Sequence, residues 1–149
     1  MYRRTIMSKV SVVYWSGTGN TQAMADAVGE GIAQAGGEAD VVSVDAASVD
    51  DLAAQKAFAL GCPAMGAEVL EEVEFDPFIS EVEAIASGKT ILLFGSYGWG
   101  DGQWMRDWEE RMTDAGAVLL GGEGVICQEA PDDDVLDTLR AFGGQLAGI

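Results

Sequence analysis

The chain has 149 residues, of which 48% are hydrophobic, and this length and composition support one domain with a hydrophobic core. Its formal net charge is −17, from 25 acidic and 8 basic residues, which argues against binding to nucleic acids or anionic membranes because both recognise cationic side chains. Histidine is absent, which excludes histidine-dependent catalytic triads and the usual histidine metal ligands. We therefore expect no catalytic residues and no metal site, and the charge favours a cationic protein partner.

The amino-terminal segment lacks the pattern of a targeting signal. Residues 1–6 carry charge, but no apolar segment follows them, and no run in the chain approaches the ~20 apolar residues of a membrane span. Met7 stands just before the first strand pattern. We expect residues 1–7 to be a disordered or non-native extension, residues 8–149 to form the folded domain, and the protein to be cytoplasmic.

The two cysteines, Cys62 and Cys127, form no Cys-x-x-Cys pair, so neither a redox dithiol nor a zinc site is expected. Cys127 lies in a strand-like run and is predicted to be a buried structural thiol. Cys62 lies in a loop, where a chemical role of its own is the less favoured interpretation.

Apolar runs alternate with helical patterns along the chain, which is typical of an α/β fold with a parallel sheet. Strands are predicted at residues 10–15, 39–44, 57–61 and 90–94, and a fifth at 117–120, at 124–127, or at both. Helices are predicted from residue 21 to a pair of glycines at 36–37, at 49–54, from 76 to a cap at Gly88, through 105–112, and through 135–146. Right-handed crossovers make this a three-layer, doubly wound sandwich with five parallel strands, whose ligand crevice lies at the carboxyl ends of the strands.

The loop after the first predicted strand, residues 16–21, is short, rich in hydroxyl groups and opens a helix. The start of a helix offers unpaired N–H groups and a partial positive charge to an anion. Gln22 replaces the third glycine of a dinucleotide motif, and no lysine completes a Walker A loop. The pattern therefore predicts a neutral cradle for one terminal phosphate monoester on a larger ligand, with a plain capped glycine turn as the alternative.

Three stretches resemble the flavin-binding loops of the flavodoxin family. Residues 14–21, Tyr-Trp-Ser-Gly-Thr-Gly-Asn-Thr, look like the loop that binds the phosphate of flavin mononucleotide (FMN). Residues 61–68, Gly-Cys-Pro-Ala-Met-Gly-Ala-Glu, and 94–102, Phe-Gly-Ser-Tyr-Gly-Trp-Gly-Asp-Gly, look like the two loops that hold the flavin ring. The similarity runs in the family's order and spacing from about Lys9 to the carboxyl terminus, and is closest to the short-chain group from anaerobic bacteria. It implies a flavodoxin-like sheet in the order 2-1-3-4-5 and one non-covalently bound FMN.

The resemblance implies cofactor contacts from all three loops. Trp99, set among glycines, could stack on one face of the ring, and the flexible Met65 could cover the other. Judged alone, each of these two is more often a core residue, and Trp104 and Trp108 are predicted to be core. The full set of predicted cofactor-binding residues is Ser16, Gly17, Thr18, Gly19, Asn20, Thr21, Pro63, Ala64, Met65, Gly66, Ala67, Glu68, Ser96, Tyr97, Gly98, Trp99 and Gly100.

Two residues of the second loop carry the mechanism that the family implies. The peptide after Gly66 is expected to turn over on reduction, so that its carbonyl accepts a hydrogen bond from flavin N5–H, and glycine permits the positive φ this needs. Glu68 matches a family glutamate that accepts from flavin N3–H, with a solvated surface acid as the alternative. Three departures from the family pattern, at Pro63, Ala67 and Glu129, bear on affinity and potential rather than on the identity of the cofactor.

The charges are unevenly distributed. Lys9, Lys56 and Lys89 each precede a strand, which places them at the amino-terminal edge of a parallel sheet. Seven acids and no base lie between residues 68 and 83, and a second acidic cluster spans residues 129–137. We expect an acidic end around the flavin, which attracts basic partners and disfavours an anionic hydroquinone.

These features predict a low-potential, monomeric one-electron carrier that uses the semiquinone/hydroquinone couple of FMN. The expected partners are redox proteins with basic docking surfaces, namely flavodoxin or ferredoxin reductases and iron–sulfur oxidoreductases. The alternative is an FMN-dependent NAD(P)H or quinone reductase, although the sequence has no basic cluster for a 2′-phosphate. A receiver-type signalling domain is disfavoured, because it needs acidic residues where Trp15-Ser16 and Cys62-Pro63 stand.

Overall fold

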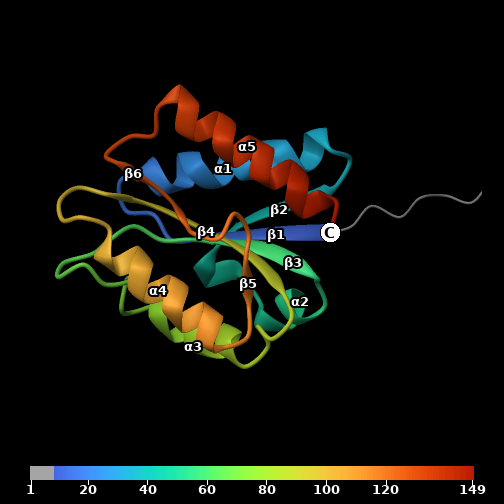
Figure 1. Ribbon diagram of the computed structural model, residues 1–149, viewed down its shortest axis with the longest axis horizontal. Coiled ribbons are helices and arrows are strands. Elements are labelled where there is room, and N and C mark those ends of the chain that lie inside the picture. Colours follow the sequence, from blue (N-terminus) through green and yellow to red (C-terminus); the bar gives the residue numbers. More distant parts are fainter. Residues whose placement is uncertain (1–8) are drawn as a thin grey trace, which may run out of the picture.

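The computed structural model describes residues 9–149, and it shows a parallel sheet between two layers of helices (Figure 1). Helices α1 and α5 cover one face, and α3 and α4 cover the other. The predicted extension at residues 1–7 and the predicted domain start at residue 8 lie outside the described residues. The strands are β1 Lys9–Tyr14, β2 Glu38–Ser43, β3 Ala57–Gly61, β4 Thr90–Tyr97, β5 Val118–Leu119 and β6 Val125–Gln128. The helices are α1 Asn20–Gln34, α2 Val49–Ala53, α3 Phe75–Glu83, α4 Gln103–Asp114 and α5 Asp133–Ala147, with a 3-10 turn at Val44–Ala46.

The strand order β2-β1-β3-β4-β5 confirms the predicted topology, and every pairing is parallel. Both candidate segments for the fifth strand contribute. β5 pairs with the start of β4 and β6 pairs with its end, while a turn closed by Gly122 N–H and the Leu119 carbonyl (3.0 Å) separates them. The fifth position of the sheet is therefore a strand in two pieces.

Two sequence-based predictions need correction. The helix predicted to run to Gly88 ends at Glu83, because two tight turns follow it, closed by Ile85 N–H to Val82 (2.9 Å) and Lys89 N–H to Ala86 (3.0 Å). Cys127 is only half-buried, since it lies on β6, which pairs with β4 alone.

Strand β4 is buried on both faces, as its nearly continuous apolar sequence predicts. Ile91 and Leu93 belong to the cluster under α3 and α4, whereas Leu92 and Phe94 belong to the cluster under α1 and α5. Alternate side chains of one strand thus form the centre of both hydrophobic cores, and β4 is fixed relative to both helical layers.

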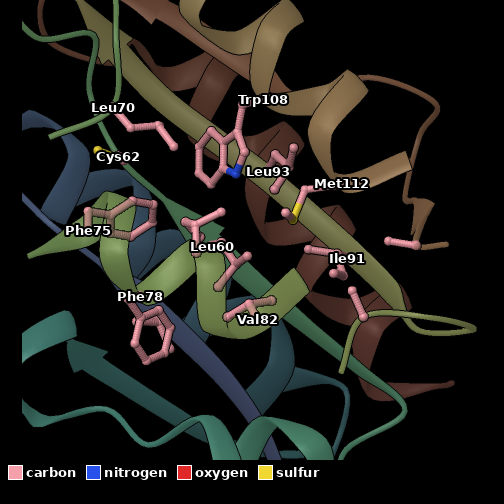
Figure 2. Close-up of a cluster of buried hydrophobic side chains, with 14 of the residues drawn as sticks. Leu60, Cys62, Leu70, Phe75, Phe78, Val82, Ile91, Leu93, Trp108 and Met112 are labelled. Atoms are coloured by element: carbon pink, nitrogen blue, oxygen red, sulfur yellow. The ribbon is translucent and has the colours of Figure 1, made fainter. Parts of the chain in front are cut away.

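Two tryptophans of α4, Trp104 and Trp108, enter the cluster under α3 and α4, and both are 1% exposed, as predicted. Figure 2 shows Trp108 among the other side chains of this cluster. The ring of Trp108 packs edge-on against Phe75 at 5.4 Å between centroids, but its indole N–H has no acceptor among residues 9–149. The indole N–H of Trp104 instead donates to the Cys62 carbonyl at 3.1 Å. The same carbonyl fills the space that a side chain at Gly95 would need, so β4 and the loop after β3 meet backbone to backbone.

We expect Trp104→Phe to destabilise the protein by about 1–2 kcal/mol more than Trp108→Phe. Both changes remove the same ring volume, but only the first leaves a buried carbonyl without its donor. Urea unfolding of both variants measures the difference. Equal losses would show that the Trp104–Cys62 hydrogen bond contributes nothing to stability.

Candidate functional site

A groove of about 210 Å³ lies at the carboxyl ends of β1, β3 and β4, at the left-hand end of the sheet in Figure 1. The strand order reverses between β1 and β3, and ligands of open α/β sheets bind at such a switch point. A larger hollow of about 340 Å³ lies at the opposite, amino-terminal edge, where such sheets do not hold their ligands. The smaller groove is lined by Trp15, Gly17, Thr18, Asn20, Pro63, Ala64, Met65, Ser96, Tyr97, Gly98 and Glu129.

All three predicted loops reach this end of the sheet, and nine of the predicted cofactor-binding residues are among the groove-lining residues named above. The others lie outside the groove wall: Ser16, Gly19 and Thr21 at the start of α1, Gly66, Ala67 and Glu68 at the second loop's tip, and Trp99 and Gly100 on the third loop. Trp99 is 65% exposed, so it is not a core residue.

Two groove residues, Trp15 and Glu129, are absent from the predicted set of cofactor contacts. Their positions in the sequence could have indicated this, because residues just after the carboxyl ends of parallel strands line the ligand crevice. Trp15 follows β1, and Glu129 follows β6.

In the loop before α1 and the first turn of that helix, two backbone N–H groups donate to the same side-chain oxygen. Ser16 Oγ accepts hydrogen bonds from the N–H groups of Gly19 (3.1 Å) and Gln22 (3.3 Å). Thr21 is 1% exposed, and its hydroxyl has no hydrogen-bond partner among the described residues. A buried hydroxyl without an acceptor costs free energy, and a phosphate oxygen at the start of α1 would provide the acceptor. The loop therefore fits a terminal phosphate without any cationic side chain.

The second loop is a tight hairpin. Met65 and Val69 exchange two backbone hydrogen bonds (2.8 and 3.0 Å), which leaves Gly66, Ala67 and Glu68 at the tip. Gly66 has φ +44°, and the space where a side chain would project is empty. The conformation itself, rather than crowding, thus favours glycine at this position.

Glu68 connects this hairpin to the third loop. Its carboxylate accepts a hydrogen bond from the N–H of Gln103, the first residue of α4, at 3.1 Å. A side chain at Gly100 would overlap the same carboxylate. Glu68 is therefore half-buried and hydrogen-bonded in this structure, which differs from the fully solvated surface acid of the alternative interpretation.

A buried carboxylate holds the chain that follows the hairpin. Glu71 is 8% exposed and accepts from the N–H groups of Val73 (2.9 Å), Glu74 (2.7 Å) and Phe75 (2.9 Å). Burial alone raises the pKa of Glu71, but the three N–H donors outweigh it and leave the pKa below its ordinary value. Trp15 joins this segment through its indole N–H, which donates to Glu74 Oε1 at 3.3 Å.

Cys62 has the properties of a structural thiol. Its side chain is fully buried, and burial raises the pKa of the thiol far above its ordinary value, despite the contact between its sulfur and the N–H of Glu71. A thiolate is the reactive form of cysteine, so this residue is inert at neutral pH.

The lysines lie at the amino-terminal edge, as predicted, where Lys9 pairs with Asp51 (3.3 Å) and Lys89 donates to the Ala53 and Gln55 carbonyls. Within the described part of the chain, one base from elsewhere in the fold forms ion pairs with the first acidic segment, residues 68–83. Arg111 of α4 bridges Asp76 (2.8 Å) and Glu83 (3.0 Å) of α3. That segment is thus partly neutralised by a residue distant in the sequence.

Residues 9–149 contain no cluster of three or more His, Cys, Asp or Glu side chains arranged to hold a metal ion. Over the same range, no helix has both the length and the apolar character needed to cross a membrane.

Fold and groove together define a doubly wound α/β protein with a ligand site at the carboxyl ends of its strands. A family model described as Flavodoxin matches residues 12–143. A flavodoxin from Clostridium beijerinckii is 47% identical over 140 residues, covering 94% of this chain and 100% of the relative. A flavodoxin from Megasphaera elsdenii is 44% identical over 124 residues, covering 83% of this chain and 89% of the relative. The solution structure of two-electron reduced Megasphaera elsdenii flavodoxin matches with a TM-score of 0.82 at 40% identity, over 91% of this chain and 98% of that one.

The chain belongs to the flavodoxin family, and its similarity to the Clostridium and Megasphaera proteins confirms the predicted resemblance to short-chain flavodoxins. It is an FMN-binding electron carrier, not an enzyme that turns over a substrate of its own. The comparisons give no support to the alternative of an FMN-dependent reductase.

We expect Glu71→Gln to lower the free energy of unfolding at pH 7 by about 2 kcal/mol, because three backbone N–H groups, of which that of Phe75 is buried, lose a charged acceptor. The pKa of Glu71 is lower in the folded chain than in the unfolded chain, so its contribution is complete above about pH 4.3 and is lost as the pH falls through the folded pKa. Urea unfolding of the wild type and of Glu71→Gln from about pH 7 to about pH 2 measures this. The difference between their unfolding free energies should narrow as the pH falls.

The exposed neighbour Glu72 provides the control, since Glu72→Gln should change the unfolding free energy by no more than about 0.5 kcal/mol. A gap between wild type and Glu71→Gln that stays constant down to about pH 2 would contradict the assignment.

Proposed function

We propose that the groove holds FMN with its phosphate in the loop at residues 16–21 and its ring between Met65 and Trp99. The observation that carries this proposal is the buried hydroxyl of Thr21, which has no partner among the described residues and lies where α1 begins. Helix α1 starts after Gly19 with no side-chain hydrogen bond from this cap residue, and the partial positive charge at the helix amino terminus attracts an anion. Met65 lines the groove and Trp99 is a large exposed aromatic on the adjoining loop, which supports their assignment to the ring.

Bound FMN supplies the redox chemistry, since it accepts and releases electrons one at a time. The chain supplies the hydrogen bonds and the electrostatic field that set the two potentials. The backbone at Gly66, at the tip of the hairpin, provides a carbonyl acceptor for the N–H that only reduced flavin carries. Glu68 provides an acceptor for the ring's N3–H from the same loop.

The acidic surface lowers the second reduction potential. Each carboxylate about 10 Å from the ring raises the free energy of adding negative charge by roughly 1–2 kcal/mol at an effective dielectric of about 20, before screening by salt. The ion pairs of Arg111 reduce this effect for Asp76 and Glu83, and the ion pair of Arg106 (3.0 Å) reduces it for Asp101. Glu72 is exposed and has no ion pair among residues 9–149. The protein is therefore a low-potential carrier that cycles between its one-electron and two-electron reduced forms.

The same end of the molecule is the docking surface for redox partners. Three exposed apolar side chains, Val69 (39%), Val73 (82%) and Trp99 (65%), lie on the two loops beside the groove among acidic residues. An apolar centre with an acidic rim fits the basic docking surfaces of flavodoxin or ferredoxin reductases and of iron–sulfur oxidoreductases. The carrier acts as a monomer in the cytoplasm.

Thr21→Val tests the phosphate assignment. The variant keeps the shape of the side chain and removes the unpartnered hydroxyl, so the stability of the apoprotein stays the same or rises slightly. Its affinity for FMN falls roughly tenfold, because one hydrogen bond to a charged phosphate is lost. Its affinity for riboflavin, which lacks the phosphate, is unchanged. Quenching of flavin fluorescence gives both constants, and equal losses for the two flavins would place the phosphate elsewhere.

Gly66→Val tests the hairpin tip. A β-branched residue resists positive φ and so hinders rotation of this peptide, and loss of a hydrogen bond of about 1 kcal/mol lowers the first reduction potential relative to the second by roughly 40–60 mV. Gly88→Val is the matched control, since Gly88 also has positive φ and open space but lies far along the chain. A redox titration in which Gly66→Val keeps both wild-type potentials would remove Gly66 from the mechanism.

A further inference from the structure

Glu129 is the only charged residue among the described residues that line the groove. The other lining residues are apolar or carry neutral hydroxyl, amide or indole groups. Glu129 therefore determines the local charge of a site whose ligand is itself an anion.

The backbone holds Glu129 firmly at this position. The N–H of Glu129 donates to the Tyr97 carbonyl at 2.8 Å, and the carbonyl of Glu129 accepts from Ser96 Oγ at 2.6 Å. Its φ of +60° is uncommon for a residue other than glycine, so the local structure imposes the conformation. Since Ser96 and Tyr97 end β4, the residue after β6 is fixed to the groove wall.

The side chain of Glu129 is not neutralised by the rest of the chain. Its Oε1 lies 3.6 Å from the position that a Cβ on Gly98 would occupy, which places the carboxylate beside the third loop. No hydrogen-bond donor or cation among residues 9–149 contacts this carboxylate. Glu68 and Glu71, by contrast, each accept hydrogen bonds from backbone N–H groups.

The cradle at residues 16–21 offers a phosphate only N–H and O–H groups, and its residues Gly17, Thr18 and Asn20 line the same groove as Glu129. A phosphate monoester carries between one and two negative charges at neutral pH. We infer that Glu129 is a specificity-determining residue that reduces the preference of the groove for a phosphorylated flavin over an unphosphorylated one. This inference rests on the proposed function, namely that the groove holds the flavin and its phosphate.

The ratio of two binding constants isolates this effect. Any hydrogen bond between Glu129 and the sugar-alcohol chain of the ligand is available to FMN and riboflavin alike, so it cancels in the ratio of their dissociation constants. The repulsion between Glu129 and the phosphate does not cancel. Removing one charge in a partly solvated groove should change the ratio by about three- to tenfold at low salt.

The experiment titrates FMN and riboflavin into the full-length apoprotein of the wild type, Glu129→Gln and Glu38→Gln, by quenching of flavin fluorescence at low and high salt. Glu38→Gln is the matched control, because it removes the same charge where β2 begins beside Lys9, at the opposite edge of the sheet. Glu129→Asn is a second variant, since asparagine tolerates positive φ better than most residues.

We expect both variants at position 129 to strengthen FMN binding relative to riboflavin binding by about three- to tenfold, with a smaller effect at high salt. Glu38→Gln should leave the ratio within about twofold of the wild type, because the charge it removes is distant and screened. An unchanged ratio at position 129, with both flavins still bound, would overturn the inference and leave the proposed function intact. Failure of the wild type to bind either flavin would instead overturn the proposed function.

Discussion

The burial of β4 on both faces is the constraint on which the rest of the structure depends. Every N–H and C=O group of a strand inside two apolar layers needs a partner from a neighbouring strand. β3 supplies these partners on one side, and β5 and β6 supply them on the other. The carboxyl end of β4 is thereby fixed next to the loop after β3, and the hydrogen bond from Trp104 to the Cys62 carbonyl extends that attachment beyond the sheet. This arrangement positions two of the three groove loops, the one after β3 and the one after β4.

The groove combines a neutral cradle with a strongly acidic surface, and the two have different physical origins. The cradle depends on backbone N–H groups at the start of α1, whose orientation is set by the helix and not by flexible side chains. The acidic residues lie on loops, and the structure engages them unequally. Glu71 is enclosed by three N–H groups and Arg111 pairs with Asp76 and Glu83, whereas Glu129 has no such partner in the described part of the chain. The effective charge near the ligand is consequently smaller than the count of acids in the sequence suggests.

The features that depend on local pattern could be predicted from the sequence. The bounds of β3 are those expected, the alternation of hydrophobic clusters along β4 follows from its apolar run, and the three loops reach the same edge because parallel strands bring their carboxyl ends together. The features that depend on contacts between segments distant in the sequence could not be predicted in this way. The three hydrogen bonds to Glu71 and the ion pairs of Arg111 need the folded backbone to define them. The position of Glu129 in the groove follows from the pairing of β6 with β4, which the sequence left open between two segments.

The division of the fifth strand into β5 and β6 also affects how copies of this protein meet one another. An unpaired sheet edge can recruit a strand from another molecule, and long, flat, apolar edges do so most readily. Here one free edge consists of pieces of two and four residues interrupted by a turn, too short and too irregular to template a foreign strand. The opposite edge, β2, carries Glu38 and Asp40, and like charges would oppose its pairing with an identical strand. Both edges of the sheet thereby oppose edge-to-edge aggregation.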